Sequence, residues 1–182
     1  EVWLGGLAGR SSAVVLTLGT GLGSGVISDD YIWRGKHLTG PELGHVYMGE
    51  NKLTCGCGQS GCAETWLNKH ALEGIFREQG CVLDDVREMV FSLEEGDDKA
   101  WATMEIYGAR LGFYISILQV IFGIANIGIS GGLSSFLPYC RNYVWLELKE
   151  RLQKRRLWLP EQIVASAAPE TSALYGMARA WM

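Results

Sequence analysis

Residues 13–27 read AVVLTLGTGLGSGVI, a β-rich apolar run that ends in alternating glycines before the apolar pattern resumes. The first part of this run predicts a strand, and Val26 and Ile27 continue the pattern on a second strand. A tight turn through the glycines would join the two strands as a β-hairpin.

Beyond the hairpin, the chain changes from strand patterns to a long loop and then to helices. A third short strand is expected around Tyr31 to Trp33, and residues 35–61 form a loop with little periodicity and many Gly, Pro, Thr and Asn residues. The later elements are expected to be helices over 64–76, 83–92 and 97–122, a strand over 124–130, a helix from Ser134 or Ser135 to about 156, a strand at 163–164 and a helix over 170–181. This order predicts a mixed α/β fold, and 182 residues fit one domain.

The composition disfavours several classes of function. The net charge is -4, from 20 acidic and 16 basic residues, so no strong positive field would gather nucleic acid. No apolar stretch reaches the roughly 18 residues that a membrane-spanning helix needs. The first residues lack the charged region and the apolar region of a signal peptide. We therefore expect a cytoplasmic protein whose partners include neither membrane nor nucleic acid.

The strongest local signal is a cluster of histidine and cysteine. His45 precedes the run CGCGQSGC, which supplies Cys55, Cys57 and Cys62. Three thiolates and one imidazole match the ligands of a closed tetrahedral zinc site without a position for a catalytic water, so the zinc would be structural. The glycines between the cysteines would let the backbone bring the sulfurs to one ion. The alternative is that three free cysteines share a loop with a surface histidine.

The remaining cysteines and histidines have no comparable neighbours in the sequence. We interpret Cys81 and Cys140 as small apolar core residues. His37 and His70 are expected in a loop or on the surface.

Four segments together resemble the signature of a known family. Residues 42–45 read ELGH and residues 55–64 read CGCGQSGCAE. They resemble the E-x-G-H and C-x-C-G-x-x-G-C-x-E pattern of the ROK family, which contains bacterial sugar kinases and repressors. The run LGTGLGSG at 18–25 resembles the second phosphate motif of the family, and ISGGLS at 129–134 resembles its adenosine-side glycine motif.

The resemblance implies an actin-like, ribonuclease-H-like ATPase domain with a structural zinc loop within residues 35–64. In the family, sugar hydroxyls are contacted by the glutamate of E-x-G-H, by the zinc-binding histidine and by the glutamate after the last cysteine. Carried over, these residues are Glu42, His45 and Glu64. Zinc would fix the tautomer of the imidazole so that its other nitrogen faces the sugar. From the residues alone, Glu64 could equally be a helix N-terminal charge and Glu42 a solvated loop residue.

The two glycine motifs imply a nucleotide site for ATP with magnesium. Thr20 and Gly21 would supply a hydroxyl and backbone N–H groups to phosphate oxygens. Gly131 and Gly132 would leave room for the adenosine. The alternatives are an ordinary hairpin turn and a plain strand-to-helix turn.

The sequence departs from the family pattern at several positions. The catalytic Asp of an N-D motif and the first phosphate loop, D-x-G-G-T, are absent, and no Asp occurs before Asp29. We therefore expect a carboxy-terminal portion of a longer protein that is inactive as a kinase on its own. Pro41 stands where the family usually has a glycine, and Ser24 replaces a common glycine in the phosphate loop. These two differences bear on sugar specificity.

The resemblance implies an ATP-dependent sugar kinase that phosphorylates a hexose or an N-acetylhexosamine. The surviving glycine motifs favour a kinase over the alternative, the sugar-sensing domain of a ROK-type transcriptional repressor. A third hypothesis is a zinc-stabilised interaction domain without a small-molecule site. Family members commonly dimerise, and tryptophans in the apolar helices leave room for a homodimer interface, although core packing explains most of them equally well. These tryptophans are Trp66, Trp101, Trp145, Trp158 and Trp181.

Overall fold

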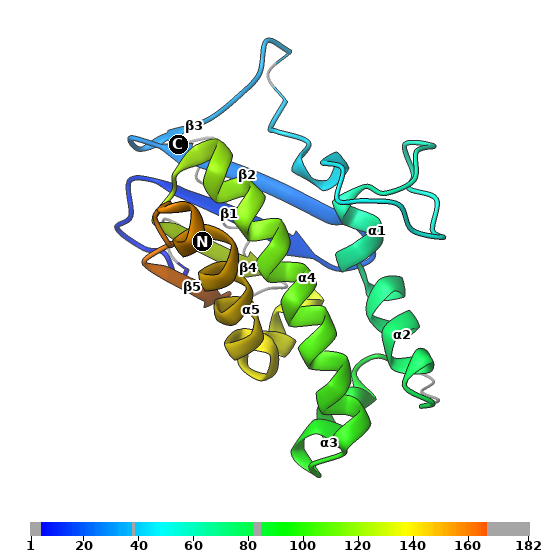
Figure 1. The fold of residues 1–182 in the computed structure, drawn as a ribbon. Helices are drawn as coiled ribbons and strands as arrows, with labels where there is room; N and C mark the ends of the chain where they lie inside the picture. The colour runs from blue at the N-terminus through cyan, green and yellow to red at the C-terminus, as the bar shows by residue number, and fades with distance from the viewer. Residues whose placement is uncertain (1–4, 38, 82–84, 167–182) are drawn as a thin grey trace.

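A five-stranded mixed sheet forms the centre of the fold (Figure 1). The computed structural model describes residues 5–37, 39–81 and 85–166. The strands are β1 (Ala13–Leu18), β2 (Leu22–Ser28), β3 (Tyr31–Ile32), β4 (Asn126–Ser130) and β5 (Gln162–Ala165). Their order is β3-β2-β1-β4-β5, with β1 antiparallel to β2 and parallel to β4. The β2–β3 pair is antiparallel and the β4–β5 pair is parallel, so the predicted mixed α/β class is confirmed.

The predicted β-hairpin is confirmed, but its turn is shorter than the glycine run indicated. Leu18 lies opposite Leu22, so only residues 19–21 connect the two strands. Gly23 and Gly25 therefore belong to β2. Glycine weakens an isolated strand, but continuous pairing with β1 keeps this backbone extended.

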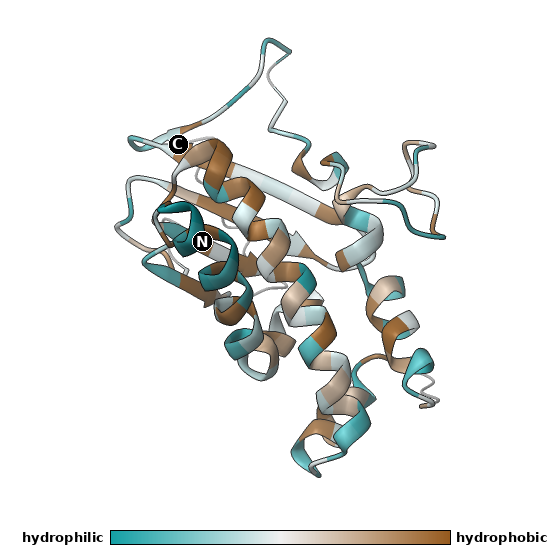
Figure 2. Cartoon of the chain, viewed as in Figure 1, coloured by the Kyte–Doolittle hydropathy of each residue, from teal (hydrophilic) through white to brown (hydrophobic). Residues whose placement is uncertain are grey.

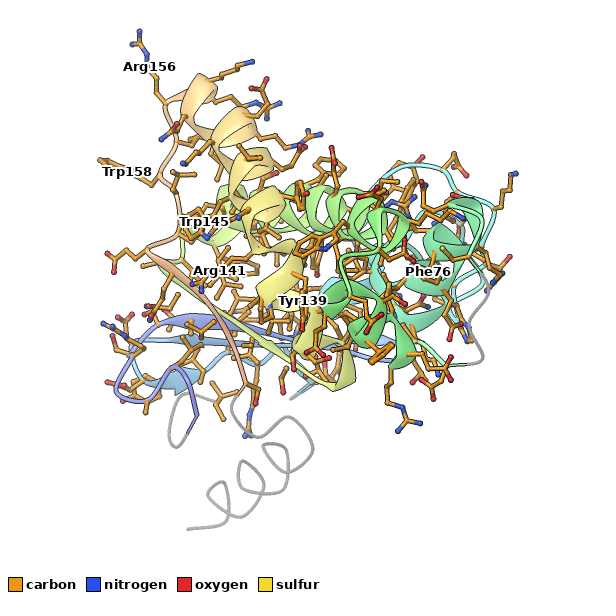
Figure 3. The ribbon with its side chains drawn as sticks, turned by 90° about the horizontal axis from the view of Figure 1, so that it is seen from below. Phe76, Tyr139, Arg141, Trp145, Arg156 and Trp158 are labelled. Carbon is orange, nitrogen blue, oxygen red and sulfur yellow. The ribbon has the colours of Figure 1, made fainter. Side chains whose placement is uncertain are left out.

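Two long helices cover one face of the sheet. The helices are α1 (Ala63–Leu67), α2 (Lys69–Glu78), α3 (Glu88–Glu94), α4 (Asp98–Phe122) and α5 (Leu137–Leu152), with 3-10 helices η1 (Leu43–His45), η2 (Gly132–Phe136) and η3 (Gln153–Arg155). Figures 1 and 3 show α4 and α5 side by side against this face. The helix predicted over 97–122 is confirmed as α4. The Asp97 side chain accepts a hydrogen bond from the Lys99 amide at its start, and Gly123 adopts a left-handed conformation at its end.

The first predicted helix, over 64–76, is divided in the structure. α1 ends at Leu67 and α2 begins at Lys69, because Asn68 between them has an extended backbone with ψ of 175°. The Asn68 side chain accepts a hydrogen bond from the Ala71 amide and so caps α2. Asparagine favours caps over helix interiors, and this preference prevails over the helical spacing of the apolar residues.

Two other helix boundaries differ from the prediction. α3 spans Glu88–Glu94 rather than 83–92. Neither Ser134 nor Ser135 caps α5, because both lie in η2, and α5 has Pro138 in its first turn. Proline lacks an amide hydrogen and has a helical φ, so it suits a position where no intrahelical hydrogen bond is lost.

The remaining strands match their predictions. β3 lies within 31–33, β4 lies within 124–130, and β5 includes 163–164. The predicted helix over 170–181 lies outside the described residues, as do positions 83 and 84 of the second predicted helix.

An apolar core lies between the sheet and the helices. Figure 2 shows apolar residues along α4 and in the central strands, and hydrophilic residues on much of α5. Tyr107, Tyr114 and Phe136 are among the largest fully buried side chains. Cys140 is buried in this core, as predicted, whereas Cys81 is only partly buried and packs against the core. Among the described helices, none has both the length and the apolar character that crossing a bilayer requires.

The surface residues include both histidines outside the cysteine cluster and some of the tryptophans. His37 and His70 are exposed, as predicted. Trp145 packs partly against the core, whereas Trp158 is 85% exposed and, with Arg156, points away from the fold in Figure 3. The homodimer interface stays a prediction.

Two glycines let α4 and α5 approach each other closely. A Cβ at Gly108 would lie 2.7 Å from the carbonyl oxygen of Cys140. A Cβ at Gly112 would lie 2.7 Å from the carbonyl oxygen of Val144. Both clashes are with backbone, which cannot rotate away as a side chain can, so the helix pair depends on the absence of side chains here.

We predict that Gly108→Ala lowers the free energy of unfolding by about 1–3 kcal/mol, because the added methyl forces the two helices apart. Gly74→Ala in α2 is the matched control, since a Cβ there meets nothing within 4 Å. Alanine favours the helix by about 0.5–1 kcal/mol over glycine, so the control should raise stability. Urea unfolding followed by circular dichroism measures both changes, and a shift of the same sign in both variants would contradict the close packing.

Candidate functional site

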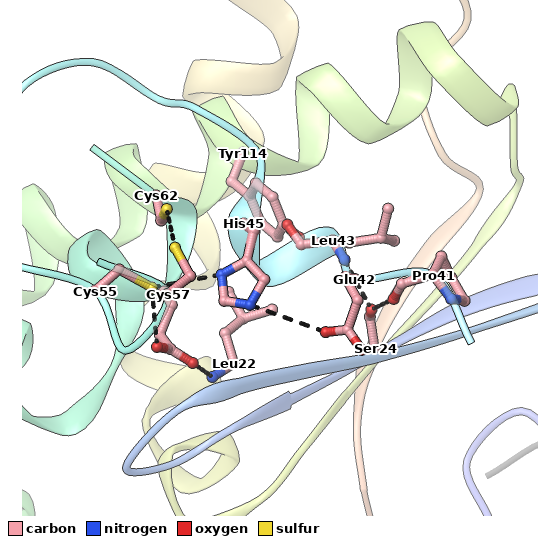
Figure 4. Close-up of polar contacts among 11 residues, drawn as sticks. Leu22, Ser24, Pro41, Glu42, Leu43, His45, Cys55, Cys57, Cys62 and Tyr114 are labelled. Atoms are coloured by element: carbon pink, nitrogen blue, oxygen red, sulfur yellow. Dashed lines mark hydrogen bonds and ion pairs between the residues drawn. The ribbon is translucent and has the colours of Figure 1, made fainter. Parts of the chain in front are cut away.

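Four side chains from three parts of the chain converge on one point (Figure 4). His45 is the last residue of η1, Cys55 and Cys57 lie in the following loop, and Cys62 immediately precedes α1. Their ligand atoms all lie within 4.8 Å of one another. His45 Nδ1 is 3.4 Å from Cys55 Sγ, and the sulfurs of Cys57 and Cys62 are 3.6 Å apart.

These separations suit the ligands of one tetrahedral metal ion. Metal–sulfur bonds of about 2.3 Å and metal–nitrogen bonds of about 2.0 Å place tetrahedral ligand atoms about 3.5–3.8 Å apart. All five cysteines are free thiols in the structure, so none of the four ligand candidates is consumed by a disulfide. The four side chains that the sequence singled out could therefore hold a metal ion.

Backbone contacts close the loop around this cluster. Isolated β-bridges pair Tyr47 with Cys62 and Thr54 with Ser60. Gly61 has a φ of +79°, and a Cβ there would lie 2.5 Å from the Tyr47 ring. Both the backbone conformation and the lack of space require glycine before the last cysteine.

The thiols of the cluster differ in their environments. Burial raises the pKa of Cys62 to about 12, and hydrogen bonds with the neighbouring thiols add to this effect. Cys57 is exposed, and a hydrogen bond to the Gln59 backbone lowers its pKa. Packing three thiols together opposes their joint ionisation, whereas a cation among them would favour it.

The two nitrogens of His45 face different groups. Nδ1 faces the thiols, and Nε2 lies 4.0 Å from Glu42 Oε2. A metal bound through Nδ1 would leave Nε2 directed toward Glu42. The Glu42 side chain is 80% exposed and is therefore accessible to a ligand.

Glu64 connects the cysteine cluster to the glycine hairpin. Its Oε2 accepts a hydrogen bond of 3.0 Å from the Leu22 amide, and the Cys55 thiol donates to its Oε1 at 3.4 Å. A Cβ at Gly21 would lie 2.7 Å from Glu64 Oε2, so a side chain there would displace the carboxylate. A residue predicted to bind sugar thus touches the turn predicted to bind phosphate.

Ser24, which the sequence linked to sugar specificity without a contact, and Tyr114, which the sequence did not single out for the site, both hold the site's loop. Ser24 Oγ donates to the Pro41 carbonyl at 2.5 Å and accepts from the Leu43 amide at 3.3 Å. Tyr114 Oη, in α4, donates to the Leu43 carbonyl at 2.9 Å. Sequence spacing places Tyr114 only on an apolar helix face, because its partner is 71 residues away.

The two glycine motifs meet at one edge of the sheet. β1 and β4 are parallel neighbours, so the residues that follow them lie side by side. Gly131 has a φ of +83°, and a Cβ there would lie 2.3 Å from the Leu18 carbonyl oxygen. Thr20 and Gly132 are exposed at this edge. Open α/β sheets bind ligands at the carboxyl ends of parallel strands, so these residues could hold a nucleotide.

Comparison with known proteins identifies the family. The model of the ROK family matches residues 1–182. The chain belongs to the ROK family. Its ROK relatives include a glucokinase from Thermotoga maritima that is 41% identical over 141 residues, which are 76% of this chain and 44% of the glucokinase.

Solved ROK structures share the fold of this chain. A ROK family glucokinase from Streptomyces griseus in complex with glucose and AMPPNP has a TM-score of 0.85 at 22% identity, covering 95% of this chain and 61% of that one. A ROK family transcriptional regulator, a homologue of the E. coli MLC protein, has a TM-score of 0.75 at 22% identity, covering 91% of this chain and 44% of that one. The chain spans about half the length of the relatives it matches. This likeness agrees with the expected actin-like ATPase fold.

We predict that the purified chain binds one metal ion through the four-residue cluster. Cys62→Ser should lose most of the bound metal, because an alcohol is a poor substitute for a thiolate ligand. Cys81→Ser, which changes a cysteine outside the cluster, should keep it. Elemental analysis after dialysis measures the metal content. Equal metal loss in the two variants would contradict the ligand assignment.

Metal affinity should fall as the pH is lowered, because the ligands must lose their protons to bind. The pKa of Cys62, at about 12 without metal, means that binding near neutral pH releases a proton from this thiol. Calorimetric titration in two buffers with different heats of ionisation counts the protons released. Identical heats in both buffers would be inconsistent with binding through these thiols.

Proposed function

We propose that this chain carries the sugar site and the nucleotide site of an ATP-dependent sugar kinase that phosphorylates a hexose or an N-acetylhexosamine. The observation that supports this most strongly is the hydrogen bond from Leu22, in the glycine hairpin, to Glu64 of the candidate sugar site. Phosphoryl transfer depends on holding the donor and the acceptor hydroxyl side by side, and the two candidate sites are neighbours. Similarity to a glucokinase supports the same function.

In this proposal Glu42, His45 and Glu64 bind the sugar. Each carboxylate has two oxygens that accept hydrogen bonds from hydroxyls, and Glu64 can do so while it accepts from Leu22. His45 presents Nε2 to the sugar while Nδ1 binds the metal.

The proposed metal is zinc, because three thiolates and one imidazole are typical ligands of a structural zinc site. This ligand set leaves no open coordination position. The ion therefore shapes the loop and does not act on the sugar. His45 is the one residue that belongs to both the metal site and the sugar site.

The nucleotide binds where β1 and β4 end. The Thr20 hydroxyl and the backbone amides near Gly21 bind phosphate oxygens, while Gly131 and Gly132 accommodate the adenosine. In this proposal ATP supplies the phosphoryl group, and magnesium would neutralise the negative charge of the phosphates. We assign no catalytic base among the residues of this chain, so its part in the reaction is to bind and orient both substrates.

A sugar-sensing domain of a ROK-type repressor is the second candidate. The likeness of the fold to a ROK transcriptional regulator favours it. A sensing domain requires the sugar-binding side chains but does not require a phosphate-binding turn. ATP-dependent turnover therefore separates the two functions.

We predict that the native full-length protein releases ADP in the presence of glucose, N-acetylglucosamine or N-acetylmannosamine, measured by a coupled assay. Glu42→Gln should lower kcat/KM for the sugar about 10- to 100-fold, because a hydrogen bond to a charged group contributes about 1.5–3 kcal/mol. Glu50→Gln is the control, since this carboxylate lies in the same loop and accepts hydrogen bonds from Tyr47 and Ser60.

The outcomes separate the candidate functions. Sugar binding without ADP release, with every sugar tested, would favour the sensing domain. An equal decrease of kcat/KM for the sugar in the Glu42 and Glu50 variants would contradict the assignment of Glu42 to the sugar site.

A further inference from the structure

Ser24 joins β2 to the backbone on both sides of Glu42 (Figure 4). Its hydroxyl donates to the carbonyl of Pro41, the residue before Glu42, at 2.5 Å. The same oxygen accepts from the amide of Leu43, the residue after Glu42, at 3.3 Å. A hydroxyl has one donor and two acceptor positions, so one side chain can make both bonds.

The direction of the Glu42 side chain depends on this backbone. The side chain is 80% exposed, and within the described residues its nearby ring nitrogen, His45 Nε2, lies 4.0 Å away. Such exposed pairs contribute little to holding a side chain in place. Pro41 has no amide hydrogen with which to anchor the peptide before Glu42. The two bonds to Ser24 therefore limit the freedom of residue 42.

The segment that follows Glu42 is held by other contacts. A Cβ at Gly44 would lie 2.4 Å from the Leu22 carbonyl oxygen, so η1 packs directly on β2. Tyr114 donates to the Leu43 carbonyl from the core side. The His45 amide also donates to the Glu42 carbonyl at 3.1 Å. Loss of the Ser24 hydroxyl would leave these three contacts in place, so the loop would stay on β2. The freedom gained would be at the Pro41 carbonyl and the Leu43 amide, the two backbone groups that Ser24 binds.

We propose that Ser24 is a positioning residue for sugar recognition, which acts by fixing the backbone on both sides of Glu42 and thereby aiming its carboxylate. This inference rests on the sugar-kinase function proposed above. In this proposal Ser24 acts through Glu42 and not by contact with either substrate. A residue without a side-chain hydroxyl at this position could make neither bond.

The test compares Ser24→Ala, Ser24→Thr and Ser28→Ala in the native full-length protein. Ser28 is the matched control, because it lies in the same strand and its exposed hydroxyl donates to Asp29. Ser24→Ala should raise the KM for the sugar about tenfold, as expected for loss of one to two hydrogen bonds, and leave kcat and the KM for ATP within about twofold. Ser24→Thr keeps the hydroxyl and should restore the sugar KM to within about twofold of the unmodified protein.

Hydrogen exchange provides a readout that does not depend on activity. The Leu43 amide should exchange faster in Ser24→Ala, because its acceptor is removed. The Met48 amide, which donates to the Gly61 carbonyl at 2.8 Å, should keep its protection. Faster exchange at both amides would show general loosening of the loop and would overturn the proposal.

Four further results decide whether Ser24 has this role. An unchanged sugar KM in Ser24→Ala, in a protein that phosphorylates its sugar, would overturn the role of Ser24 and leave the proposed function intact. A rise in the KM for ATP as large as the rise in the sugar KM would place the effect in the phosphate turn. That result would also overturn the role of Ser24. If the unmodified protein binds sugar without phosphorylating it, the kinase function is wrong. The sugar Kd of the same variants then tests Ser24, and an unchanged Kd in Ser24→Ala would overturn its role. A protein that binds no sugar overturns both.

Discussion

The loop between β3 and α1 depends on the meeting of one imidazole and three thiols at a single point. Most of the described part of this loop is exposed, and only a few of its apolar side chains, such as Leu43 and Met48, pack into the core. Buried Cys62 lies where the loop enters α1, and His45 ends η1, a short helix within the described part of the loop. A cation shared by these side chains would connect η1 to the start of α1 and add stabilisation to the segment between them.

Strand β2 is the common platform of the candidate sugar and nucleotide sites. The Leu22 amide binds Glu64, the Leu22 carbonyl lies against Gly44, and Ser24 binds the peptides around Glu42. The same strand begins directly after the turn that is proposed to bind phosphate. The proposed sugar and phosphate sites therefore share one strand, which suits a reaction that depends on the relative position of two substrates.

The sequence predicted those features that arise from local chemistry. The spacing of Cys55, Cys57 and Cys62 after His45 is informative because few other functions need so many soft ligands within a short segment. The apolar run of residues 13–27, interrupted by its glycines, predicted the hairpin. The helical spacing of apolar residues over 97–122 predicted α4, because that pattern repeats over many residues.

Other features depend on contacts that no local pattern records. The break at Asn68 arises because a cap competes with helix propagation at one residue. The start of α5 follows Pro138 rather than the serines before it. Ser24 and Tyr114 gain their roles from partners that are distant in the chain, so only the folded structure shows that they hold the site.

The most direct test of this account is X-ray absorption spectroscopy of the metal in the purified protein, which reports the identity, number and distance of its ligands. The account predicts one zinc ion with three sulfur ligands at about 2.3 Å and one nitrogen ligand at about 2.0 Å. A first shell of oxygen ligands, or a protein that folds with no metal at these four residues, would contradict it.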